Sequence, residues 1–129
     1  MCKGCLSDRF FHFAHMIVEN KEELGLVEDT ARKIRELKIQ IKKDLIRDKA
    51  DIEVIGVDVL AKLWDQKIDV EGIDRLLDTK YELKKGSVKR LIRAFAMLKD
   101  LLTPEQLRKA KAICKAEKRA ERTEERCCR

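Results

Sequence analysis

Residues 65–69, DQKID, separate two long stretches of amphipathic pattern, and this break decides the fold that the sequence predicts. On both sides, apolar residues recur at spacings of three, four and seven, which places them on one face of an α-helix. Before the break they are Ile34, Leu37, Ile41, Leu45, Ile52, Ile55, Val59 and Leu63; after it they are Ile73, Leu77, Tyr81, Val88, Ile92, Phe95 and Leu98. Asp69 is suited to cap the second helix, because its carboxylate accepts hydrogen bonds from free first-turn amides.

Two long helices joined by about five residues are expected to fold back on each other as an antiparallel hairpin, because each apolar face needs a partner. At about 1.5 Å per residue, each helix is on the order of 50 Å long. A hairpin this thin buries little apolar surface by itself. The sequence therefore predicts that a second copy or a further helix covers the rest.

A shorter helix is predicted on each side of the hairpin, which gives four helices in all. The first runs from about Ser7 to Glu23, with Phe10, Phe13, Ile17 and Leu24 at helical spacing. The last begins at Thr103, where Pro104 occupies the first helical position and its missing N–H costs nothing. Gln106, three residues after the cap, completes a capping box with Thr103.

Composition agrees with a single all-α domain over residues 1–129. Charged residues make up 42% of the chain and aromatic residues 5%, and one proline and five glycines leave few breaks for a sheet-rich fold. No run approaches the roughly 18 apolar residues of a membrane span. The start of the chain lacks the pattern of a signal peptide, so a cytoplasmic location stays open beside export with a removed leader.

The net charge of +6 is concentrated at the end of the chain. Residues 108–129 hold nine Lys/Arg and four Asp/Glu, whereas the other 107 residues hold 21 basic and 20 acidic side chains. Residues 114–129 are therefore interpreted as a basic tail that frays, and residues 1–9 as a cysteine-bearing N-terminal segment. A basic tail also permits contact with nucleic acid or another polyanion.

The sequence shows no set of residues with the pattern of an enzyme active site. It has no Gly-rich phosphate loop, no Ser/His/Asp set and no pair of acidic residues in a setting that suggests general acid–base catalysis. We therefore predict that the protein is not an enzyme.

Cysteines and histidines at the two ends of the chain form a candidate metal site. Cys2 and Cys5 have C-x-x-C spacing, and Leu6 stands where c-type haem attachment requires histidine, which excludes that chemistry. His12 and His15 share one face of the first helix, and a structural zinc site needs four N or S donors. The candidate ligands of Zn²⁺ are Cys2, Cys5, His12, His15, Cys127 and Cys128. The alternative is that the histidines are ordinary surface residues and the cysteines are tail thiols.

Leu102–Gln106, LTPEQ, resembles the LTxxQ motif of the Spy/CpxP family of envelope stress proteins, which includes zinc-associated ZraP-like proteins and periplasmic heavy-metal sensors. Family members carry the motif twice, and the earlier copy here would be Leu26–Thr30, LVEDT. In that copy Val27 replaces the threonine and Thr30 replaces the glutamine. With the helix pattern, the resemblance spans roughly residues 10–113.

The resemblance implies a hooked helical hairpin that dimerises into a shallow cradle in the periplasm. It implies a role in the stress response or in heavy-metal resistance, either as an ATP-independent chaperone for unfolded clients or as a zinc-binding sensor. Flexible apolar residues that suit client binding are Met16, Trp64, Phe95 and Met97, although such spacing more often marks a core. The alternative function is a cytoplasmic helical interaction module whose basic tail binds an acidic partner or, less favoured, nucleic acid.

Overall fold

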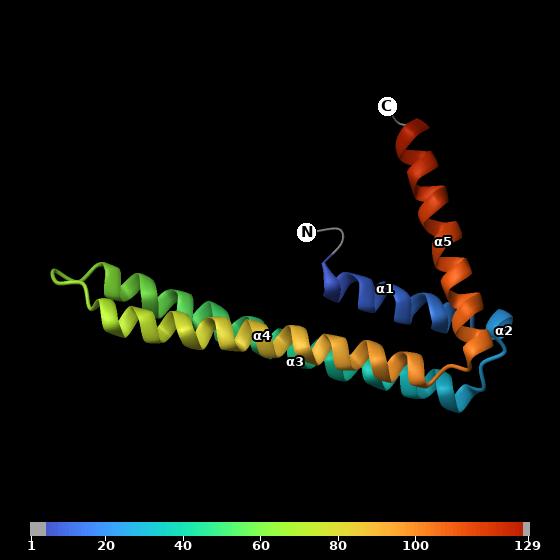
Figure 1. Ribbon diagram of the computed structural model, residues 1–129, viewed down its shortest axis with the longest axis horizontal. Coiled ribbons are helices and arrows are strands. Elements are labelled where there is room, and N and C mark those ends of the chain that lie inside the picture. The colour runs from blue at the N-terminus through green and yellow to red at the C-terminus, as the bar shows by residue number, and fades with distance from the viewer. Residues whose placement is uncertain (1–4, 128–129) are drawn as a thin grey trace. The chain divides into compact units, whose positions relative to one another are not determined.

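The structure is a computed structural model that describes residues 5–127, with side chains up to residue 122. Within this range every regular element is an α-helix, and there are five (Figure 1): α1 (Leu6–Glu19), α2 (Lys21–Leu24), α3 (Glu28–Leu63), α4 (Val70–Asp100) and α5 (Pro104–Cys127). The prediction of an all-α protein with a long helical pair is confirmed for these residues. None of the described helices has both the length and the apolar character needed to cross a membrane.

The described residues divide into two compact units. We call residues 39–93 the central unit, and the residues up to Lys38 together with those from Ala94 onward the terminal unit. The helices α3 and α4 contribute residues to both. The single domain over residues 1–129 stays a prediction, and each unit is described by itself.

The core of the terminal unit forms where α1, α2 and α5 meet one another and the adjoining ends of α3 and α4 (Figure 1). Its buried apolar side chains are Phe10, Ala14, Met16, Ile17, Leu24, Ala31, Ile34, Ala94, Leu98, Leu102 and Ala110. The Phe10 ring packs edge-on against that of Phe95, with 5.4 Å between the ring centroids. Four of these residues are alanines, whose small side chains allow helices to approach closely. The predicted apolar face of the first helix is therefore confirmed at Phe10 and Ile17.

The first helical segment differs from the prediction, because residues 7–23 form two helices and not one. Asn20 lies at the break, where its backbone N–H donates to the carbonyl of Met16 (3.1 Å). Its side-chain Nδ2 donates to the same carbonyl at 2.8 Å. An asparagine that binds its own backbone in this way competes with helix continuation. The chain consequently has five helices in the described range where four were predicted.

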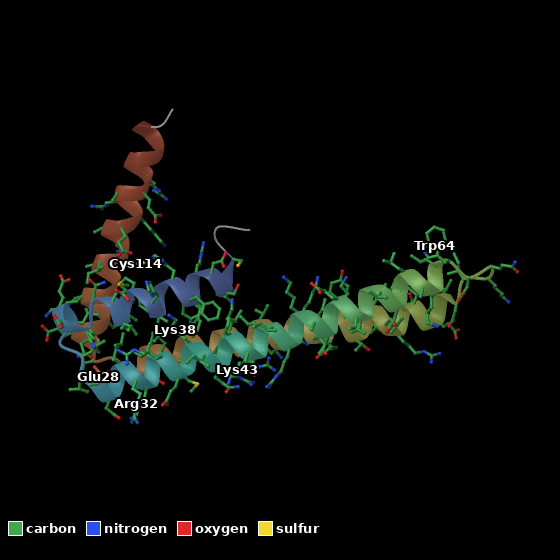
Figure 2. The ribbon with its side chains drawn as sticks, turned by 180° about the vertical axis from the view of Figure 1, so that it is seen from behind. Glu28, Arg32, Lys38, Lys43, Trp64 and Cys114 are labelled. Atoms are coloured by element: carbon green, nitrogen blue, oxygen red, sulfur yellow. The ribbon has the colours of Figure 1, made fainter. Side chains whose placement is uncertain are left out.

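In the central unit, α3 and α4 lie side by side and the chain reverses at residues 64–69 (Figures 1 and 2). Asp48 of α3 accepts a hydrogen bond from Arg90 of α4, and the Asp48 side chain is only 14% exposed. The predicted cap is confirmed, since the Gly72 N–H donates to Asp69 Oδ1 at 3.1 Å. A Cβ at residue 72 would lie 2.2 Å from Asp69 Oδ2, so a larger residue there would displace the capping carboxylate. This bond and the Lys62 ammonium together lower the pKa of Asp69.

The predicted apolar face of α4 is partly wrong. Tyr81, Val88 and Ile92 are exposed, and Leu91 is buried in their place. At about 100° per residue, Val88, Tyr81 and Ile92 lie about 60–100° around the helix from Leu91, so they fall at the outer edge of the predicted face. On α3, Ile34, Ile41 and Ile55 are buried as predicted, but Leu63 is 47% exposed. Several large apolar side chains therefore face outward.

Candidate functional site

The LTPEQ segment begins α5 with a complete capping box. The Gln106 N–H donates to Thr103 Oγ1 at 3.2 Å, and the Thr103 N–H donates to Gln106 Oε1 at 3.0 Å. Both bonds were predicted from the sequence, because all of the partners lie within four residues. Leu102, the first residue of the motif, is 7% exposed and belongs to the core of the terminal unit.

Gln106 also reaches the segment that precedes the earlier motif copy. Its Nε2 donates to the carbonyl of Gly25 at 3.3 Å. Gly25 ends α2 in the left-handed conformation (φ 71°), which glycine adopts without strain. One glutamine therefore caps α5 and ties it to the residue before Leu26. Sequence reasoning assigned Gln106 only the cap, since no local pattern indicates a contact over 81 residues.

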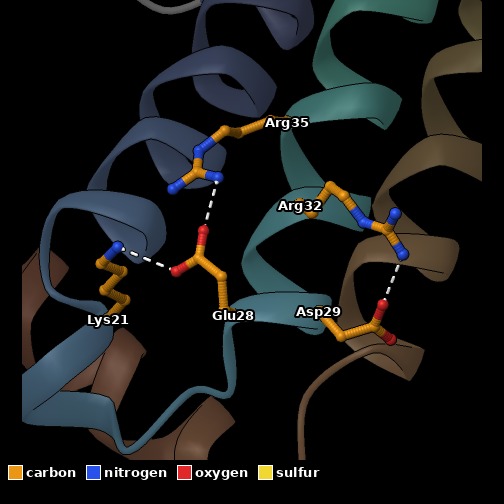
Figure 3. A network of polar contacts seen from close by, with 5 residues as sticks. All are labelled: Lys21, Glu28, Asp29, Arg32 and Arg35. Carbon is orange, nitrogen blue, oxygen red and sulfur yellow. Dashed lines mark hydrogen bonds and ion pairs between the residues drawn. The ribbon is translucent and has the colours of Figure 1, made fainter.

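At the earlier motif copy, Leu26–Thr30, ion pairs stabilise the first turn of α3 (Figure 3). Glu28 accepts hydrogen bonds from Arg35 and Lys21, each at 3.1 Å, and both interactions hold the pKa of Glu28 below its usual value. Asp29 pairs with Arg32, which lowers the pKa of Asp29. Carboxylates here also face the positive end of the helix dipole. The stabilisation is present at neutral pH and is lost as the pH falls through these lowered pKa values.

The candidate metal ligands are not brought together among the described residues. His12 Nε2 lies 3.4 Å from Glu117 Oε2 on α5, Cys5 Sγ lies 3.1 Å from Ser7 Oγ, and His15 is exposed. Within the part of the chain that the structure describes, no three His, Cys, Asp or Glu side chains are placed to hold one metal ion. Cys2, Cys128 and the Cys127 side chain lie outside that part.

Glu117 is the partner of His12 that sequence reasoning missed. The signal was present on α5, where Ala110 and Glu117 are seven residues apart and therefore share a helix face. Ala110 is fully buried on that face and Glu117 is partly buried. Cys114, between them, is a half-buried free thiol.

Outward-facing apolar side chains are concentrated in the central unit. Those exposed by 47% or more are Ile39, Ile46, Val54, Val57, Leu60, Leu63, Trp64, Ile68, Val70, Tyr81, Val88 and Ile92. Trp64 is 86% exposed at the turn (Figure 2). Of the other candidates for client contact, Met16 is buried, Phe95 is half-buried and Met97 is 56% exposed. Scattered surface apolar residues are ordinary, but sets of them along one helix face indicate a binding surface.

One such set lies on α4 among lysines. Tyr81, Val88 and Ile92 fall within about one third of the helix circumference, at about 100° per residue. The Lys84 ammonium lies 5.3 Å and the Lys80 ammonium 6.0 Å from the centroid of the Tyr81 ring. We call the surface of Tyr81, Val88 and Ile92 the α4 face. It can contact apolar and acidic groups together.

An open groove of about 370 Å³ runs along α5, lined by Pro104, Leu107, Arg108, Lys111, Ala112 and Lys115. Its charged lining residues, Arg108, Lys111 and Lys115, are all cations. The groove therefore suits an anionic group.

Comparison of the chain with family models, curated proteins and solved structures gave no match. The Spy/CpxP resemblance consequently depends on the two motif segments and on the helix pattern.

The Thr103 cap provides a prediction about stability. Thr103→Ala is expected to lower the free energy of unfolding by about 1 kcal/mol, because the Gln106 amide loses its acceptor. Thr103→Ser keeps the hydroxyl and should retain most of the stability. Thermal unfolding followed by circular dichroism measures both. If Thr103→Ala abolished binding of a client at an unchanged melting temperature, the motif would be a contact surface and the interpretation as a cap would be insufficient.

Proposed function

We propose that the protein is a non-enzymatic chaperone of the Spy/CpxP type, acting in envelope or heavy-metal stress. It holds unfolded polypeptide segments on the α4 face without ATP. The long pair α3 and α4 serves as a helical hairpin, and two copies form the working unit. The periplasm is the compartment that the family resemblance implies for this activity.

The observation that carries this proposal is the exposure of Tyr81, Val88 and Ile92 beside lysines. An unfolded client offers apolar side chains, whose burial contributes roughly 25 cal/mol per Å². Shallow contacts of this kind remain weak individually, so that a client can leave and fold. Lysines around the apolar residues attract acidic segments of clients and keep the surface soluble.

The test is suppression of aggregation of a reduced, unfolded client protein, measured by light scattering without nucleotide. The parent chain is expected to suppress scattering in proportion to its concentration. Tyr81→Ser/Val88→Ser/Ile92→Ser should lose most of this effect, because the α4 face loses its apolar area. Melting temperature should change little, since all three side chains are already exposed.

A matched control is Val54→Ser, which removes an exposed apolar side chain from α3 in the same unit. It should hold the client as the parent does. If the triple variant suppressed aggregation as well as the parent does, the α4 face would not bind clients.

The α5 groove supports a second candidate function, the binding of an acidic partner. Arg108, Lys111 and Lys115 would supply the attraction. Binding driven by these charges should weaken steeply as salt is raised. Client holding on apolar side chains should persist, so a salt series separates the two functions.

Zinc regulation is part of the proposal through His12 and Glu117. Two ligands of a tetrahedral zinc with bonds of about 2.0–2.1 Å are roughly 3.4 Å apart. The His12 and Glu117 donor atoms have that separation, but two donors do not make a site. Further donors would have to come from Cys5, from His15 or from the thiols of residues 2, 127 and 128.

We therefore expect zinc to raise the melting temperature of the reduced protein, since a ligand that binds only the folded state stabilises it. His12→Ala/His15→Ala should lose most of that shift. Deletion of residues 127–129 tests whether the C-terminal thiols take part. If the double variant responds to zinc as the parent does, the histidines are not ligands.

A further inference from the structure

The turn between α3 and α4 presents a group of large apolar side chains that face solvent. Each is exposed by 47% or more, and they are Leu60, Leu63, Trp64, Ile68 and Val70. Figure 2 shows the Trp64 side chain projecting from the ribbon at the turn, where it is 86% exposed. A group of large exposed apolar residues indicates a binding surface, whereas a single one does not. We call these five residues the turn surface.

Polar contacts, and not the side chains of the turn surface, hold the turn together. The Gly72 N–H donates to Asp69 Oδ1 at 3.1 Å, and the Lys62 ammonium lies 3.2 Å from Asp69 Oδ2. The backbone N–H groups of Trp64 and Asp65 donate to carbonyls of the last turn of α3, at 3.3 Å and 3.4 Å. The backbone under the turn surface is therefore ordered before any partner arrives, which lowers the entropic cost of binding.

The charges around the turn surface are mainly negative. Residues 51–78 hold eight Asp/Glu and three Lys/Arg, which is a net charge of −5. Two of the three cations already pair with carboxylates of the same range. Asp58, Asp65 and Asp74 have no ion-pair partner in the part of the chain that the structure describes. The turn surface therefore combines exposed apolar side chains with unpaired negative charge.

We propose that the turn surface docks a polypeptide segment of another protein in which lysine or arginine side chains surround apolar ones. The apolar side chains of that segment cover Trp64 and its neighbours, and its cations pair with Asp58, Asp65 and Asp74. Tryptophan is among the residues that contribute most to binding at protein interfaces. Charge complementarity sets the class of partner, because an acidic segment is repelled and a neutral one leaves the carboxylates without a partner.

A bilayer surface is the other occupant that an exposed tryptophan suits. The carboxylates around the turn surface repel anionic headgroups. A bilayer without net charge offers these carboxylates no excess of cations and would remove water from them. The charges beside Trp64 therefore favour the basic polypeptide segment.

The size of the turn surface indicates weak, reversible docking. A covered aromatic side chain buries about 150–250 Å². With four aliphatic neighbours, the contact stays below the roughly 1,200 Å² of stable interfaces. Docking here is separate from client holding, because the α4 face lies among lysines and the turn surface lies among carboxylates.

Trp64 is the only tryptophan of the chain, so the tryptophan fluorescence of the reduced full chain reports on the turn surface alone. The probe is a synthetic amphipathic peptide of leucine and lysine, and its control is the same peptide with glutamate in place of lysine. The lysine peptide should move the emission to shorter wavelength and reach saturation, because it takes Trp64 out of water. The glutamate peptide should leave the emission unchanged. No shift with the lysine peptide, or equal shifts with both, overturns the proposal.

Leu60→Ser/Ile68→Ser should weaken binding of the lysine peptide by about tenfold or more, because the turn surface loses two apolar contacts. Ile39→Ser/Ile46→Ser is the matched control, since it removes two exposed apolar side chains of the same unit far from the turn. It should bind the peptide as the parent does. Equal binding by the parent and Leu60→Ser/Ile68→Ser overturns the proposal. That variant should still suppress client aggregation, so docking and client holding fail or hold independently.

The carboxylates are tested by Asp58→Asn/Asp65→Asn. This change keeps the shape of both side chains and should weaken binding of the lysine peptide roughly fivefold, the combined effect of two exposed ion pairs. Circular dichroism confirms that the variant remains helical. Binding as tight as that of the parent would show that charge does not select the partner, contrary to the proposal.

Two further titrations address the other occupants of the turn surface. Vesicles of phosphatidylcholine, alone or mixed with phosphatidylglycerol, should leave the emission of Trp64 unchanged. A concentration series of the chain alone should also leave it unchanged. A shift to shorter wavelength in either titration would show that a bilayer or a second copy covers Trp64, and the assignment of a basic polypeptide partner would be wrong.

Discussion

Phe10→Ala is expected to lower the free energy of unfolding of the terminal unit by about 3–5 kcal/mol, the usual cost of emptying a buried phenylalanine site. Phe10 is fully buried, and its ring packs edge-on against Phe95 on α4. Its removal deletes the largest fully buried side chain of the chain's described part. Total stabilities of small domains are about 5–15 kcal/mol. The loss should therefore expose α1 to exchange well before the rest of the chain unfolds.

Hydrogen exchange of the backbone amides in residues 6–19, together with thermal unfolding, measures this effect. Phe13→Ala is the matched control, since it removes the same side chain from a half-buried position on α1. It should cost clearly less than Phe10→Ala. Equal losses would mean that the two rings are buried alike, contrary to the structure. Client holding should survive Phe10→Ala at low temperature, because the α4 face belongs to the central unit.

Features that depend on residues close in sequence were predictable. The cap at Asp69 and the capping box of Thr103 and Gln106 each involve partners three residues apart, so their chemistry is visible in the sequence itself. The break at Asn20 was missed because an asparagine within an apolar helical pattern is compatible with either continuation or termination.

Features that depend on tertiary contacts were not predictable from spacing. The bond from Gln106 to Gly25 and the pair of His12 with Glu117 join residues that only the folded chain brings together. Spacing also failed to choose between two apolar faces of one helix. On α4, Tyr81 and Leu91 both fit a helical repeat, and only packing against α3 decides that Leu91 is the buried one.

Helix α3 shows the same ambiguity. Ile41 and Ile55 lie on one apolar face, which is buried. Ile46 and Val57 then remain as unexplained apolar residues, although they repeat at coiled-coil spacing. The exposure of these side chains in the structure makes the second face visible.

Asp48→Ala is expected to lower the free energy of unfolding of the central unit by about 2 kcal/mol. The Asp48 carboxylate on α3 is largely buried and accepts a hydrogen bond from Arg90 on α4. In the variant, Arg90 loses this partner. Breaking a fully buried pair costs about 3–5 kcal/mol. The cost here is smaller because the Arg90 side chain is 42% exposed and water can replace part of the lost interaction.

A double-mutant cycle separates the pair from its surroundings. The cycle compares Asp48→Ala, Arg90→Ala and the double variant. We expect a coupling energy of about 1–2 kcal/mol, because the losses in free energy of unfolding from two residues of one ion pair do not add. Asp48→Leu/Arg90→Leu should recover most of the stability, because an apolar pair needs no desolvation of charge. Chemical unfolding followed by circular dichroism measures all four variants. Additive single losses would show that the two side chains act independently, and that apolar packing of Ile41, Ile55 and Leu91 alone aligns α3 with α4.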